Sequence, residues 1–264
     1  MDITFLGTGT SHGIPVVGCG CPVCHSTDNR DTRWRSSLLV SGGAGERLLV
    51  DVGPEFRLQA LRAGIDSLDA VFLTHAHADH IHGLDDLRPL TRYSPLPVYG
   101  NAEAIAEFRE RFSYIFRETQ RGGGKPRLVP ALAEASIVVG NVEVQGLPAK
   151  HGRLEILGWK FIADGASVAY LTDVSRIAED VFDRLRGLDL LVLGALRMRT
   201  HETHMNFAEA AELVRALAPR RALVTHLCHE HSHREAVDFF RMSGVLCGDK
   251  QAIEPAWDGL TISL

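Results

Sequence analysis

The stretch Thr74-His75-Ala76-His77-Ala78-Asp79-His80 places three histidines and one aspartate within six positions. It follows the apolar run 68–73, which has the length and composition of a buried strand. Divalent transition metals bind imidazole and carboxylate, and His75 and His77, two positions apart, would point to the same side of an extended segment. Asp79 and His80 could then face a second ion. The stretch therefore predicts a metal site at the end of a strand.

The overall composition is that of a globular protein without strong charge. Of the 264 residues, 45% are hydrophobic and 23% are charged, which is typical of a folded domain. The net charge of −5 argues against general attraction to nucleic acid or to anionic membranes. No apolar run approaches the roughly 18 residues that a membrane span needs, and the first residues lack the pattern of a signal peptide. We therefore expect a cytoplasmic protein with no membrane partner.

Hydrophobic patterning predicts an α/β fold with strands and helices in both halves of the chain. Strands are expected at 2–6, 37–40, 47–50, 68–73, 96–99, 136–139, 142–147, 159–163, 167–171, 188–193 and, as the last one, 222–224. Helical spacing occurs at 55–63, 81–90, 102–116, 178–185 and 207–217. The glycine-rich residues 42–45 should close a hairpin, and 121–126 should form a loop. Because no linker-like composition divides the chain, we predict one domain, 1–264, of two packed sheets flanked by helices.

Side chains able to bind metal lie just after predicted strands. They are Asp51, His75, His77, Asp79, His80, His151, Asp173 and His226. Residues at strand ends are held by a rigid sheet yet reach solvent, and α/β proteins place binding and catalytic groups there. Their position therefore supports a shared site, as their chemistry does.

Residues 75–80 match a known signature, HxHxDH. The order of the other candidates along the chain extends this match. An Asp-x-Gly element, Asp51 to Gly53, precedes it, and a lone histidine, an aspartate and a last histidine follow. The chain therefore resembles the metallo-β-lactamase superfamily, which implies a four-layer αββα sandwich and a two-metal hydrolase. Carried over, the resemblance assigns His75, His77 and His151 to the first metal, Asp79, His80 and His226 to the second, and Asp173 to both. Asp51 would orient a ligand histidine.

Three cysteines are grouped in the irregular loop 11–35, as Cys19-Gly20-Cys21-Pro22-Val23-Cys24. In a reducing compartment, clustered thiols favour a metal site over disulfides. A closed zinc site needs four ligands, and either His229 or Cys228 could be the fourth. The arrangement resembles the cyclic-phosphate phosphodiesterases of the carbon–phosphorus lyase pathway, whose family has a structural zinc held by three loop cysteines and a histidine. This resemblance favours His229, and Cys247 is expected to be simply buried.

One further histidine, His204, lies two residues before Asn206 and the predicted helix 207–217. The His-x-Asn element resembles the one from which this phosphodiesterase group takes its non-metal histidine. When protonated, His204 could stabilise phosphoryl oxygens or give a proton to the leaving alkoxide. His201 competes for this role, and His204 could instead be a solvated residue before an Asn206 N-cap. We name His204 and Asp79 as candidate catalytic residues.

These patterns predict a metal-dependent phosphodiesterase. The resemblance implies two active-site ions, manganese or zinc, with a bridging hydroxide that attacks phosphorus in line. It also implies one structural zinc and a homodimer. Substrates would be small phosphodiesters, such as a ribosyl cyclic phosphate or a 2′,3′-cyclic nucleotide, and Lys150, Arg35 and Arg88 are cations that could meet a phosphate.

Three other functions share this ligand set. A tRNA 3′-processing endonuclease should carry a long basic arm, because phosphate contacts dominate such affinity, and the stretch 121–127 is short. Nucleic acid is therefore an unlikely partner. Hydrolysis of a thiolester or lactone is the second of these functions. From a different class comes a non-catalytic accessory protein of cofactor synthesis, in which His204 should have no role.

Overall fold

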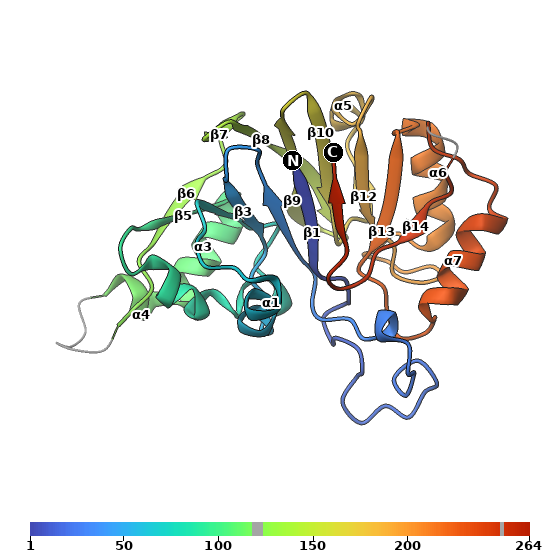
Figure 1. Ribbon diagram of the computed structural model, residues 1–264, viewed down its shortest axis with the longest axis horizontal. Coiled ribbons are helices and arrows are strands. Elements are labelled where there is room, and N and C mark those ends of the chain that lie inside the picture. The colour runs from blue at the N-terminus through green and yellow to red at the C-terminus, as the bar shows by residue number, and fades with distance from the viewer. Residues whose placement is uncertain (118–123, 249–250) are drawn as a thin grey trace.

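Two β-sheets pack face to face, and helices cover the outer surface of each sheet (Figure 1). The computed structural model describes residues 1–117, 124–248 and 251–264, so the first half of the predicted loop at 121–126 lies outside the described residues. Its layers run helix, sheet, sheet, helix. The four-layer αββα sandwich expected from the sequence is confirmed.

The first sheet has seven strands in the order β15-β1-β2-β3-β4-β5-β6. They are β1 (Asp2–Gly7), β2 (Ser37–Ser41), β3 (Arg47–Val50), β4 (Ala70–Phe72), β5 (Leu96–Gly100), β6 (Leu128–Leu132) and β15 (Thr261–Ser263). β2 and β3 form the predicted antiparallel hairpin, and β3 to β6 run parallel. The helical segments of this half are α1 (Phe56–Ala63), α2 (Ala78–Ile81), α3 (Ala102–Arg111), α4 (Ser113–Phe116) and the 3-10 helices η1 (Asn29–Asp31) and η2 (Leu84–Thr91).

The second sheet has eight strands, in the order β11-β8-β9-β10-β12-β13-β14 with β7 beside β8. They are β7 (Ile137–Val139), β8 (Val142–His151), β9 (Leu154–Ala163), β10 (Ala166–Leu171), β11 (Arg176–Ile177), β12 (Leu190–Gly194), β13 (Arg221–Thr225) and β14 (Glu254–Pro255). Its helices are α5 (Glu179–Arg184), α6 (Phe207–Leu217) and α7 (His233–Met242). No helix in the described ranges is long and apolar enough to cross a bilayer.

Three apolar cores separate the four layers. Successive residues of a strand point to opposite faces, so a strand buried on both faces needs an unbroken apolar run. In β12, Leu190 and Val192 face the core between the sheets, and Leu191 and Leu193 face the core beneath the outer helices. The third core lies between the first sheet and helices α1 and α3. This arrangement explains why the apolar run 188–193 has no polar interruption.

The C-terminal part of the chain holds more structure than the sequence predicted. The expectation that 222–224 is the last strand is wrong, because β14 and β15 follow it and join opposite sheets. They are two and three residues long, and their pairing partners lie far away in the sequence. Helix α7 was also missed, although Ser232 and Glu235 form a capping box at its start, which is a recognisable sequence signal.

Two predicted helices are shorter or of another type. The helix expected at 102–116 is divided at Phe112 into α3 and α4. In place of one α-helix at 81–90 the chain forms α2 and then η2, which contains Pro89, a residue without the N–H that a regular α-helix needs. Strand β6 was missed because Pro130 argues against a strand; it lies at the sheet edge, where proline is tolerated.

Three buried residues just after strands have a backbone conformation unusual for side chains with a Cβ atom. Asp51 follows β3, Asp173 lies two residues after β10, and His226 follows β13, with φ angles of 58°, 56° and 58°. Non-glycine residues in this left-handed region carry strain, and such strain concentrates at functional sites. The three side chains are turned inward at one end of the sandwich.

Candidate metal sites

The strand ends bring His75, His77 and His151 into one cluster. One ring nitrogen of each lies within 4.8 Å of the others, and His75 Nε2 is 2.9 Å from His77 Nδ1. His75 and His151 are buried, whereas His77 is exposed. A site of three protein ligands with one open side is typical of catalytic metals, because substrate or water can take the remaining position.

A second group of donor atoms surrounds the buried carboxylate of Asp173. Its Oδ2 lies 3.3 Å from His80 Nε2, and its Oδ1 lies 3.2 Å from His226 Nε2. Asp79 Oδ2 is 3.2 Å from the same His80 nitrogen. Asp173 also clusters within 4.8 Å with His75 and His80 on one side and with His151 and His204 on the other. It therefore lies between the two groups of histidines.

Asp51 and Thr74 fix the proton positions of two of these histidines. The Thr74 hydroxyl donates to Asp51 Oδ2 at 2.8 Å, so at 3.0 Å it accepts from His75 Nδ1–H. His80 Nδ1 lies 2.7 Å from the same carboxylate oxygen, which accepts its proton. In both rings Nε2 is therefore the atom that can bind a metal, as expected when the other ring nitrogen is hydrogen-bonded. Asp51 thus contacts two candidate ligands, directly or through Thr74, and is not itself part of a cluster.

The other two buried imidazoles have the same orientation. His151 Nδ1 donates to the carbonyl oxygen of Thr203 at 2.8 Å. Ser36 gives its only hydroxyl proton to the Gly9 carbonyl, so at 3.1 Å it must accept from His226 Nδ1–H. Four rings, two from the segment after β4 and one each from the ends of β8 and β13, therefore present their Nε2 atoms to one region.

The donor atoms fit divalent metal ions. Two ligands about 2.1 Å from a shared ion lie about 3.0 to 3.4 Å apart for angles between a right angle and the tetrahedral angle, and the separations of 2.9 to 3.3 Å agree. His80 Nε2 is fully buried and has no hydrogen-bond partner among the described residues. Although burial opposes its charged form, the carboxylates of Asp79, Asp173 and Asp51 raise the pKa of His80 well above its usual value. This surplus of negative charge would favour a cation.

His204 lies against the same group. Its ring centre is 4.6 Å from that of His151 and 5.0 Å from that of His226, and its Nδ1 is 3.7 Å from Asp173 Oδ1. Burial and the neighbouring His226 lower the pKa of His204 to about 3, so the free ring is neutral at pH 7. His201 lies farther out: it is exposed, its Nδ1 lies 3.3 Å from the Thr203 nitrogen and hydroxyl, and its ring centre is 5.0 Å from that of His204. Asn206 caps α6, as the alternative interpretation expected, but His204 is not solvated.

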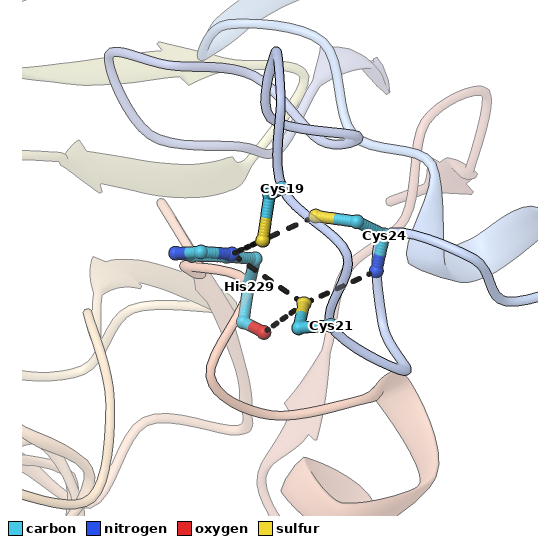
Figure 2. Close-up of side chains that lie close together, drawn as sticks. All are labelled: Cys19, Cys21, Cys24 and His229. Atoms are coloured by element: carbon cyan, nitrogen blue, oxygen red, sulfur yellow. Dashed lines mark hydrogen bonds between the residues drawn. The ribbon is translucent and has the colours of Figure 1, made fainter.

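The cysteine loop forms a separate cluster with His229 (Figure 2). His229 Nδ1 lies 3.3, 3.5 and 3.6 Å from the sulfur atoms of Cys19, Cys21 and Cys24. A tetrahedral zinc with sulfur at about 2.3 Å and nitrogen at about 2.05 Å requires a separation of about 3.6 Å, so the four side chains fit zinc. Cys228 is outside this cluster, and Cys247 is buried as expected.

A cavity of about 450 Å³ lies beside His204. Its cationic lining residues are Lys150, Arg153 and Arg176, and a smaller cavity of about 140 Å³ borders His75 and His77. Of the three cations considered from sequence, only Lys150 lines these cavities. Arg35 pairs with Glu55, and Arg88 bonds the Gly124 carbonyl.

Comparison with known proteins agrees with this geometry. The family model of the beta-lactamase superfamily domain matches residues 46–227. The chain belongs to the beta-lactamase superfamily. A solved structure described as a new diphosphatase from the PhnP family superposes with a TM-score of 0.86 and 35% identity, covering 100% of this chain and 97% of that one. The superfamily expected from the HxHxDH signature is confirmed.

Two curated relatives extend the comparison within the beta-lactamase superfamily. An octanoyltransferase of Porphyromonas gingivalis is 40% identical over 231 residues, which is 87% of this chain but only 46% of that protein. The coenzyme PQQ synthesis protein B of Methylobacterium nodulans is 28% identical over 214 residues, covering 73% of this chain and 72% of its own length. This chain thus spans less than half of the first relative.

Sequence reasoning missed several residues of this beta-lactamase superfamily site. Thr74 and Ser36 lie next to residues named from the sequence, His75 and Arg35. Their roles depend on the acceptor to which each hydroxyl donates its proton. Arg153 and Arg176 are surface cations in the sequence, and only folding brings them to the cavity beside His204. The position of Arg153, two residues after His151, was the one available signal.

We expect Asp51→Asn to weaken metal binding at His80 by about 10- to 100-fold, the usual effect of removing a group that orients a ligand histidine. The amide keeps the size of the side chain but cannot accept from both Thr74 and His80 as the carboxylate does. Metal titration of stripped protein measures the affinity, and Asp69→Asn, an exposed aspartate, serves as the control. Unchanged affinity in Asp51→Asn would contradict this role.

Proposed function

We propose that the protein is a metal-dependent phosphodiesterase that hydrolyses small phosphodiesters, including cyclic ones, at a site with two divalent ions, zinc or manganese. In this proposal His75, His77 and His151 bind the first ion, Asp79, His80 and His226 the second, and Asp173 both. The main support is the position of the Asp173 carboxylate between the two sets of imidazoles. A third ion, a structural zinc, would occupy Cys19, Cys21, Cys24 and His229.

The chemistry of such a site is phosphoryl transfer to water. Two bound ions would lower the pKa of a water molecule and neutralise charge on the phosphoryl oxygens. The chain itself holds the ligands in place through Asp51, Thr74 and Ser36, and it supplies His204 at the edge of the cluster. An anionic phosphoryl group next to His204 would favour its protonated form, which could donate to the leaving oxygen.

The cavity beside His204 supports a small substrate with more than one anionic oxygen group. About 450 Å³ is the size of a pocket for a compound such as a mononucleotide. Arg153, Arg176 and Lys150, which pairs with Glu155, line it beside Glu202 and Glu209. The two arginines could bind a second phosphate or diphosphate group there. The PhnP-family neighbour is described as a diphosphatase. The net charge of −5 disfavours a long nucleic acid.

A panel of substrates tests the proposal. Purified protein, stripped of metal and reloaded with manganese or zinc, is assayed with a 2′,3′-cyclic nucleotide, a dinucleoside diphosphate, bis(p-nitrophenyl) phosphate and a precursor tRNA. We expect turnover of the small compounds, a dependence on added metal, and no cleavage of the tRNA. Cleavage of the tRNA alone would overturn the proposal in favour of the endonuclease.

His204→Gln is expected to lower kcat on the small diester by about 10²- to 10⁴-fold, the usual contribution of general acid–base catalysis. Metal content should stay unchanged, because His204 is proposed to act on substrate oxygen. His201, which lines the same cavity, is the competing candidate, and His201→Gln should keep its metal and lose far less activity than His204→Gln. If His204→Gln instead loses metal, this histidine is a ligand, which its distance to Asp173 also permits.

A role in cofactor synthesis is a second candidate, favoured by the likeness to the coenzyme PQQ synthesis proteins. A non-catalytic accessory protein should turn over none of the substrates of the panel, even when it is fully loaded with metal. His204→Gln should then have no effect. Loss of the cysteine cluster would still impair folding. Absence of turnover with fully loaded protein would therefore support this candidate over the phosphodiesterase.

A further inference from the structure

Arg33 is a fully buried cation next to the cysteine cluster. Its guanidinium donates to the carbonyl oxygen of Cys228 at 3.0 Å and, with both terminal nitrogens, to the carbonyl of His231 at 3.3 Å. Its Nε donates to the carbonyl of Arg30. Arg33 therefore binds backbone on both sides of His229.

Asp31 completes the arrangement from the same loop. One oxygen accepts from Arg33 at 3.1 Å and from the backbone N–H of His233 at 2.6 Å. Its other oxygen accepts from the Ser26 hydroxyl at 2.7 Å. The buried pair Asp31–Arg33 thus joins the cysteine loop to the segment 226–233 at three separate backbone groups, those of residues 228, 231 and 233.

The segment 226–233 carries one proposed ligand of the two-metal active centre and one of the cysteine cluster. His226 stands at its start, beside Asp173, and His229 lies three residues later in the cysteine cluster (Figure 2). The backbone between them is held by Arg33 and by the bond from Leu227 N–H to the Thr8 carbonyl. A shift of His229 on loss of its metal would therefore be passed to His226 through a short, buried piece of chain.

We infer that Asp31 and Arg33 are positioning residues that couple the cysteine cluster to the active centre, so that filling one metal site strengthens metal binding at the other. A planar guanidinium with several fixed acceptors sets the geometry of the backbone, which a lysine cannot do. Coupling between two sites is reciprocal and commonly amounts to 5- to 150-fold in affinity. The inference rests on the proposed metal sites, but not on any substrate.

The first test uses unaltered protein. Stripped chain is titrated with Mn²⁺, which thiolates bind poorly, with and without one equivalent of zinc in the cysteine cluster, and free Mn²⁺ is followed by electron paramagnetic resonance. We expect zinc to tighten Mn²⁺ binding about tenfold. Equal Mn²⁺ affinity in both states would overturn the inference. Catalytic failure with intact coupling would count only against the proposed phosphodiesterase.

The second test assigns the coupling to the pair. Cys21→Ser should weaken Mn²⁺ binding about tenfold in the native background and by less than twofold in the Arg33→Lys background. The matched control is Arg30→Lys, since Arg30 pairs with Asp28 in the same loop but is exposed; here the tenfold effect should remain. An equal effect of Cys21→Ser in the native and Arg33→Lys backgrounds would show that Arg33 does not transmit the coupling. If Arg33→Lys does not fold, Asp31→Asn takes its place with the same expectation.

Discussion

Asp173→Asn is expected to lower kcat/KM for phosphodiester hydrolysis by about 10³-fold or more. The amide is the same size as the carboxylate but carries no charge, so it would hold two cations poorly. A loss of several kcal/mol of metal-based transition-state stabilisation corresponds to this factor. Steady-state kinetics on bis(p-nitrophenyl) phosphate, together with metal analysis, measures the effect, and the metal content of the active centre should fall in parallel.

Asp189→Asn is a suitable control for this change. The Asp189 carboxylate accepts a backbone N–H bond from Ser167 in the second sheet, but it lies outside the metal clusters. Its variant should keep both metal content and activity. If Asp173→Asn retained its ions and full activity, the assignment of Asp173 as the shared ligand would be wrong.

Cys21→Ser is expected to have the largest effect on stability. We expect Tm to fall by about 10 °C, which for a domain of this size corresponds to about 3 kcal/mol. The loop 11–35 has only a small apolar cluster of its own, formed by Ile14, Val23 and Cys24. Without a bound zinc this cluster is too small to order the loop. Thermal unfolding with and without chelator measures the change.

The neighbouring cysteine provides the comparison. Cys228→Ser changes a buried thiol that lies outside the cluster, so its Tm should fall much less and should still respond to chelator. Chelator should have little further effect on Cys21→Ser. A Cys21→Ser protein that melts like the native protein and keeps its zinc would refute the structural role of the cluster.

Local signals in the sequence single out most of the side chains that the structure brings together in the two candidate metal sites. His75, His77, Asp79 and His80 lie in one short stretch after an apolar strand, and the remaining candidates follow strands of their own. Contacts between residues far apart in the sequence have no local signal of this kind. Whether His229 or Cys228 faces the cysteine loop depends on a contact that joins residues about two hundred positions apart. The pairing of β15 with β1 and the burial of Arg33 depend on equally distant segments.

Hydroxyl protons are a second feature that sequence patterns do not encode. The orientation of His226 follows from the fact that Ser36 gives its proton to Gly9. That fact requires three segments, β1 with its following turn, β2 with its preceding residue, and the end of β13, to meet at one point. Only the assembled sheets bring them together.

The left-handed backbone at residues 51, 173 and 226 has a consequence for laboratory evolution. Glycine adopts this conformation without the steric cost that a Cβ atom brings. A library screened solely for thermal stability should therefore accumulate glycine at the three positions and lose turnover as its stability rises. Directed evolution of this protein for thermal stability would have to include a screen for activity in every round.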